Sequence, residues 1–146
     1  MFKQFHSARP EKALTIDLGT KTPGPDLPTQ FFGIRYGGLL RIAKEGKYTF
    51  VLRGDRYRMF WLDGKYAGMH GSGPPARVEM ELAQGDHPIK LELAKWQGAC
   101  SMQVQWIRPG ETNAQDIPVE ALCYDPQQTA KYQESPDWKP SGWGWP

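Results

Sequence analysis

The feature that most limits the fold of this chain is an alternation of apolar and polar residues that extends from about residue 31 to residue 107. The segment RVEMELAQGDHPIKLEL, residues 77–93, shows the pattern clearly, because its apolar side chains recur at every second position and Pro88 interrupts it. A helix needs apolar residues three and four positions apart, whereas successive side chains of a strand point to opposite faces. The alternation therefore argues against helices here and predicts strands that are apolar on one face.

Turn signals divide this region into about six or seven expected strands, roughly 8–15 residues apart. The strongest signal is Asp63-Gly64, a dipeptide typical of hairpin turns that need positive φ. Gly37-Gly38 indicates either a β-bulge or a close approach of another backbone. Residues 13–18 have the pattern of one more strand, and residues 119–122 allow a short turn of helix. Together these elements predict an all-β fold, an antiparallel, barrel-like β-sandwich packed over one core.

The two ends of the chain differ in character from this middle region. At 146 residues the chain has the size of a single domain. We expect the sandwich to occupy residues 1–124, with an irregular N-terminal arm, and an extended Pro/Trp-rich tail to follow over residues 125–146. Trp138, Trp143 and Trp145 all stand in this tail, and a short polar segment cannot bury them by itself. They are therefore the expected partner-docking residues, against this domain or another chain.

Charge and hydropathy argue against two classes of partner. The formal net charge is +2, and basic and acidic residues are interspersed. A nucleic-acid-binding domain needs a clustered basic face, so no nucleic-acid partner is expected. The longest apolar run is far shorter than the about 20 residues that a membrane-spanning helix needs, so no transmembrane segment is expected. The N-terminal stretch MFKQFHSARPEKA also lacks the apolar core of a secretory signal.

The sequence shows no arrangement typical of catalysis or metal binding. His6, His70 and His87 are scattered, and spacings such as HExxH and GxSxG do not occur. We therefore expect a protein that is not an enzyme, with no cofactor and no bound metal. Cys100 and Cys123 leave two alternatives open. They either form a disulfide, which would imply an oxidising compartment, or pack as two buried thiols.

The order of these motifs resembles that of the protective-antigen-type domain family. The segments that carry the resemblance are Tyr36 to Phe50, Arg58 to Gly64, Leu82 to Leu93 and Ala99 to Gly110, within residues 31–124. The family is named for a segment of the anthrax toxin translocating subunit and recurs in bacterial glycosidases, fungal flocculins and yeast adhesins. The resemblance implies a β-sandwich that is usually extracellular and often binds carbohydrate.

The resemblance also implies a test for calcium. In the lectin members of the family, two consecutive aspartates before the hairpin coordinate Ca²⁺, which in turn holds sugar hydroxyls. The corresponding dipeptide of this chain is Asp55-Arg56. The arginine replaces an oxygen ligand with a cation that repels the metal. We therefore expect binding without calcium at this position.

The candidate ligand-binding residues stand around the expected loops. They are Asp55, Arg56, Tyr57, Trp61, Asp63 and Trp96. Trp61 alternates with Phe60 and Leu62, so its side chain is expected to face away from theirs, and an exposed indole can stack on the C–H face of a sugar ring. Trp96, in an expected loop, is a second candidate for such stacking. The alternative for Trp61 and Trp96 is packing within the second sheet or beneath the tail.

Two functional hypotheses follow. The first is a non-catalytic recognition module, extracellular or periplasmic, that binds a glycan or a cell-surface polymer through the loops at 54–58, 69–75 and 95–98. The alternative is a structural subunit of a larger assembly, such as a surface layer, filament, virion or membrane complex, that docks other protein subunits through its C-terminal tail.

Overall fold

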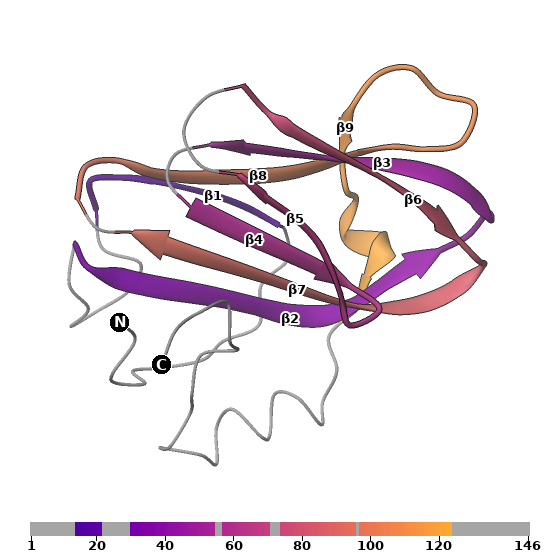
Figure 1. Cartoon of the computed structure of the whole chain (residues 1–146), viewed down its shortest axis with the longest axis horizontal. Coiled ribbons are helices and arrows are strands. Elements are labelled where there is room, and N and C mark those ends of the chain that lie inside the picture. Colours follow the sequence, from indigo (N-terminus) through magenta and orange to yellow (C-terminus); the bar gives the residue numbers. More distant parts are fainter. Residues whose placement is uncertain (1–13, 22–29, 55–56, 71–73, 96, 124–146) are drawn as a thin grey trace, which may run out of the picture.

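Two antiparallel sheets face each other across one core (Figure 1). The structure is a computed structural model, and it describes residues 14–21, 30–54, 57–70, 74–95 and 97–123. Within these residues the chain forms ten strands and one turn of 3-10 helix. The expected fold class, an all-β antiparallel sandwich, is confirmed.

The two sheets each contain five strands. The first consists, in spatial order, of β1 (Thr15–Gly19), β8 (Cys100–Ile107), β3 (Gly46–Gly54) and β6 (Ala76–Leu82), and β9 (Gln115–Asp116) also pairs with β8. The second consists of β10 (Leu122–Cys123), β2 (Phe32–Ile42), β7 (Gly85–Lys95), β4 (Tyr57–Leu62) and β5 (Lys65–His70). The turn η1 (Val119–Ala121) precedes β10, so the expected helical turn near residues 119–122 is confirmed.

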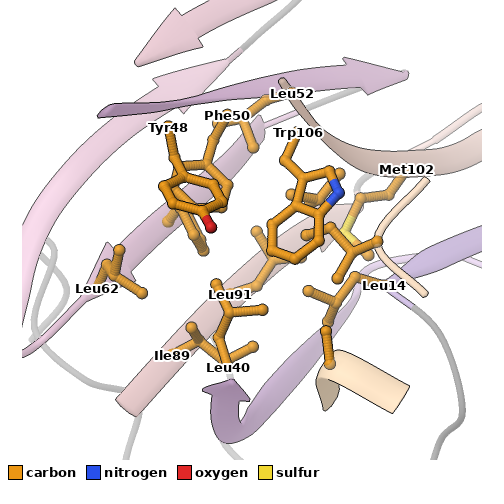
Figure 2. Close-up of a cluster of buried hydrophobic side chains, with 14 of the residues drawn as sticks. Leu14, Leu40, Tyr48, Phe50, Leu52, Leu62, Ile89, Leu91, Met102 and Trp106 are labelled. Carbon is orange, nitrogen blue, oxygen red and sulfur yellow. The ribbon is translucent and has the colours of Figure 1, made fainter. Parts of the chain in front are cut away.

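The core consists of the apolar phase of the alternation (Figure 2). In β3 and β8 the register places Phe50 opposite Trp106, and both side chains are buried. Phe60 of the other sheet lies against Phe50, with ring centroids 5.2 Å apart. Tyr48 lies against Trp106 at 5.4 Å. Burial of large apolar and aromatic side chains from both sheets is the main stabilising contribution that joins the two layers.

The pairing of β2 with β7 corrects one expectation about the glycine pair. The register is unbroken from Phe32 opposite Lys95 to Ile42 opposite Gly85, so Gly37-Gly38 forms no bulge against β7. A bulge would move all later side chains to the other face. The apolar residues of this segment keep even positions on both sides of the glycines, which agrees with an unbroken strand. The hairpin turn at Asp63-Gly64 is confirmed, because both residues have positive φ, 53° and 74°.

The strand directions divide the connections between the two ends of the sandwich. At one end, to the left in Figure 1, β2, β4, β6 and β8 begin and β1, β3, β5 and β7 end. We call this end the rim, and it carries the connections 20–31, 55–56, 71–75 and 96–99. The other end, called the far end, carries the turns at 43–45, 63–64 and 83–84.

Gly54, the last residue of β3, fixes the approach of the chain to the rim. Its φ is 120°, and a Cβ atom built on it would lie 2.3 Å from the backbone oxygen of Ser101. No side chain fits that distance, so only glycine allows β3 to lie this close to the start of β8. Gly64 of the far-end hairpin also has positive φ, at 74°, but nothing lies within 4 Å of the position of its Cβ.

We expect Gly54→Ala to destabilise the protein far more than Gly64→Ala. The substitution at 64 introduces only the unfavourable backbone conformation, about 1–2 kcal/mol. The substitution at 54 adds a clash with backbone that cannot rotate away, and a total loss above about 3 kcal/mol is expected. Urea unfolding of the two variants measures the difference. Equal losses would contradict the close approach at Ser101.

Candidate ligand-binding rim

The loops that are expected from the sequence to bind a ligand begin or end at strand ends of the rim. Tyr57 at the start of β4 is opposite Ala94 near the end of β7, and Gly54 at the end of β3 is opposite Met102 near the start of β8. The segments that follow or precede these residues therefore open at the same end of the sandwich. Asp55, Arg56 and Trp96, together with the side chain of Tyr57, lie outside the described residues, so their binding roles stay predictions.

Asp63 lies at the far end and does not join this group. It follows the last residue of β4, whereas Tyr57 begins the same strand at the rim. One strand length, about 3.3 Å per residue, separates the two. The Asp63 carboxylate accepts a hydrogen bond from Nδ1 of His87, at 2.8 Å to Oδ2, and its backbone N–H donates to the carbonyl of Pro88 at 2.9 Å. Its contacts are those of a turn residue that fastens the far end.

The His87 imidazole joins two far-end turns by its two ring nitrogens. Nδ1 faces the Asp63 carboxylate, and Nε2 lies 2.7 Å from the carbonyl oxygen of Ala83. Both partners only accept hydrogen bonds, so both ring nitrogens must carry hydrogen and the favoured form is the imidazolium. Burial lowers the pKa of His87, but the Ala83 carbonyl and the carboxylates of Asp63 and Asp86 together raise it above its ordinary value.

Trp61 lies on the outward face of the second sheet, away from the core. Its register partner on β7 is Lys90, whose Nζ lies 4.1 Å from the centroid of the indole ring. The ring of Tyr66 meets it at 5.8 Å in an edge-on arrangement. Partial burial lowers the pKa of the Lys90 ammonium. Because Lys90 already covers one face of the indole, a sugar ring could not stack on that face without displacing the ammonium.

Arg35 and Glu92 form an ion pair on the same outward face. They are opposite each other in the register of β2 and β7, and Nη2 of Arg35 lies 2.6 Å from Oε1 of Glu92. Their side chains are 10% and 1% exposed, so both charges are largely removed from water. A pair in this environment must keep both partners, because either charge alone would be strongly disfavoured.

A polar network on the first sheet was not anticipated from the sequence. Nε of Arg53 donates to Oε1 of Gln105 at 2.9 Å, and the amide of Gln105 donates to Oδ1 of Asp116 at 3.1 Å. Gln103 donates to the same carboxylate oxygen at 2.7 Å. The polar phase of the alternation identifies which of these side chains face outward, but only the register of β3, β8 and β9 shows that they meet. Arg53 precedes Gly54, so the network extends to the rim.

The sequence predicts that the described part of the chain binds no metal, and it leaves the two cysteines either paired or free. No group of three or more His, Cys, Asp or Glu side chains lies close enough together there to hold a metal ion. Cys100 is buried and Cys123 partly buried, and no disulfide joins them. Among the described residues, no helix has the length and apolar character to span a membrane. Trp138, Trp143 and Trp145 lie outside those residues, so their docking role stays a prediction.

Comparison with known families identifies the domain. The PA14 domain family matches residues 3–120, which is most of the chain. The chain belongs to the PA14 domain family. PA14 is named for anthrax protective antigen, so the resemblance carried by the sequence motifs is confirmed at the level of the family. The expected division into a domain at 1–124 and a tail at 125–146 stays a prediction.

Solved structures share the fold of this PA14 domain at low sequence identity. An anti-sigma factor domain-containing protein from Clostridium clariflavum matches with a TM-score of 0.70 at 21% identity, over 78% of this chain and 40% of that one. The A domain of Epithelial Adhesin 9 from Candida glabrata, in complex with Galβ1-3GlcNAc, matches with a TM-score of 0.62 at 16% identity, over 77% and 67%. A PA14 sugar-binding domain from an RTX adhesin matches at 0.54 and 16%, over 64% and 54%.

These similarities establish the fold alone. The chain spans about two fifths of the length of the anti-sigma factor domain-containing protein from Clostridium clariflavum. The comparison with curated proteins finds no match.

The ion pair of this PA14 domain predicts a non-additive response to substitution. We expect Glu92→Gln to lower the free energy of unfolding by about 3–5 kcal/mol, because it removes the carboxylate that pairs with the largely buried Arg35 guanidinium. The double variant R35M/E92L removes both charges and should be less destabilised than E92Q. Urea unfolding of the variants and of the double-mutant cycle measures this. The exposed pair Lys47–Glu79, with Nζ and Oε2 3.4 Å apart, is the matched control. Its disruption should change stability by less than about 1 kcal/mol.

The His87 contacts predict a stability contribution that depends on pH. The folded pKa is raised above the unfolded value, so the contribution is complete below about pH 6.5 and is lost as pH rises through the folded pKa. We expect the free energy of unfolding of the wild type to exceed that of His87→Gln by about 1–2 kcal/mol at pH 5.5, and by less at pH 9. Asp63→Asn should weaken the pH dependence, and Lys47→Ala should leave it unchanged. Urea unfolding at both pH values measures this. If the difference in unfolding free energy between wild type and His87→Gln grew with pH, it would contradict the assignment of His87 as an imidazolium.

Proposed function

We propose that this PA14 domain is a non-catalytic recognition module that binds a glycan or a cell-surface polymer through the rim, without calcium, in an extracellular or periplasmic setting. The observation that carries the proposal is the convergence of four connections at one end of a rigid sandwich. Loops presented by a fixed scaffold are the usual carriers of binding residues. In the family, the Candida glabrata adhesin domain and the RTX adhesin domain are described as sugar-bound and sugar-binding.

The proposed contacts at the rim are Asp55, Arg56, Tyr57 and Trp96. An arginine presents a fork of N–H donors that suits vicinal hydroxyls and carboxylates, and an aromatic ring suits the apolar face of a sugar. The Arg56 cation replaces the second carboxylate of the calcium-binding dipeptide, so hydrogen bonds take the place of metal coordination. Trp61 and Asp63 are not part of this proposed site, because one lies on an outward sheet face and the other at the far end.

The environment of His87 argues against a catalytic role for this residue. His87 and Asp63 have the hydrogen-bond geometry of a base and its orienting carboxylate, but Nε2, the nitrogen that would serve as the base, is engaged with the Ala83 carbonyl. An imidazole with both nitrogens bound to acceptors has no lone pair to receive a proton. The pair therefore has a structural role at the end of the sandwich opposite the proposed site.

A glycan array probed with the full chain, with and without a chelator, tests the proposal. We expect binding to at least one array member that EDTA leaves unchanged. With that member as ligand, Arg56→Ala should weaken binding about tenfold or more, because a hydrogen bond from a charged donor contributes about 1.5–3 kcal/mol. Lys47→Ala, which removes an exposed charge on the first sheet near the far end, is the matched control and should change affinity less than twofold. The absence of any glycan ligand, or its loss on chelation, would refute this function.

A further inference from the structure

Phe31, the residue before β2, has a positive φ and an exposed side chain, and both are unfavourable for a phenylalanine. Its φ is 55°, in the left-handed region, which is uncommon for a bulky side chain and unfavourable by about 1–2 kcal/mol. Its side chain is 57% exposed to water. Glycine or asparagine would suit the backbone better, and a polar residue would suit the solvent better. Neither folding requirement therefore explains a phenylalanine here.

The position of Phe31 places its ring at the rim. Phe32, the next residue, is opposite Lys95 at the end of β7. The Phe32 side chain is buried, and the Lys95 ammonium lies 5.3 Å from the centroid of its ring. Phe32 and the β2–β7 pairing thus hold the backbone beside Phe31. Trp96, a proposed contact, directly follows Lys95 in the sequence.

The other large apolar side chains that are similarly exposed in the described residues lie elsewhere. Tyr66 is 54% exposed on β5, two residues after the far-end hairpin turn, and contacts Trp61. Val119 is 49% exposed in η1, before β10, which pairs with Leu39 and Leu40 in the half of β2 nearest the far end. Phe31 is thus the one of these three that lies at the rim.

We propose that Phe31 supplies a further apolar contact of the rim site, with its ring stacked against the C–H face of a pyranose. This inference rests on the proposed glycan-binding function and adds a binding residue to it. A pyranose presents ring hydrogens on one face and hydroxyls around its edge, so it needs a flat apolar surface beside hydrogen-bonding groups. The buried Phe32 and the pairing of β2 with β7 hold the backbone beside Phe31 before the ligand arrives, which reduces the entropy lost on binding.

The test uses the fact that Phe31→Gly should have opposite effects on stability and on affinity for the ligand. Phe31→Gly relieves the positive φ, so the midpoint of thermal unfolding should stay equal to wild type or rise. Its affinity for the glycan identified on the array should fall about tenfold, since the variant loses the stacking contact. Phe31→Trp keeps an aromatic surface and should retain affinity within about threefold. Tyr66→Ala, which removes an equally exposed aromatic outside the rim, is the matched control.

The outcomes separate this inference from the function on which it rests. If wild type binds a glycan and Phe31→Gly binds it equally well, Phe31 is not a contact, although the rim function stands. If Phe31→Gly loses stability together with affinity, Phe31 has a structural role and the inference is overturned. If wild type binds no glycan on the array, the proposed function and the role of Phe31 both fail. A more stable variant with weakened binding supports the inference.

Discussion

The contact between Phe50 and Phe60 joins two sheets that otherwise share no backbone hydrogen bonds in the pairings described. Each ring belongs to the apolar phase of its strand, and the strands meet only because both apolar faces must leave water. Once the faces are packed, the short connections determine which strand ends lie together. The rim is thus a geometric consequence of burial, since two sheets packed in this way bring the intervening connections to common ends.

The same packing separates stability from recognition. The aromatic core lies between the sheets, and the His87 contacts fasten the end opposite the rim. The residues proposed to meet a ligand stand at the ends of the strands or directly beyond them, where substitution removes few core contacts. Phe31 and Gly54 are the points where the two roles meet, because each uses an unusual backbone conformation next to the loops. Such positions are typical of sites where local strain is retained for binding.

Much of this architecture could be predicted from the sequence, because alternation is a local property. The parity of Tyr48, Phe50 and Trp106 correctly identifies them as inward-facing, and the Asp63-Gly64 dipeptide identifies its turn. The same parity, continuous across residues 32–42, already argued against a bulge at Gly37-Gly38. What the pattern could not provide is the register between distant strands. This register places Lys90 over Trp61 and Glu92 beside Arg35. The position of Asp63 at the far end follows from the direction of β4. The positive φ at Phe31 likewise has no sequence signal, since phenylalanine is atypical of that conformation.

The absence of a side chain at Gly54 has a consequence for how this scaffold could be diversified. Its backbone lies so near Ser101 that the end of β3, from which the 55–56 connection leaves, is fixed by packing against β8. Side chains at 55 and 56 could therefore be randomised in a display library while the glycine holds the anchoring strand in place. New specificities could then be selected from a short segment, with the fold supplied by residues that never contact the target.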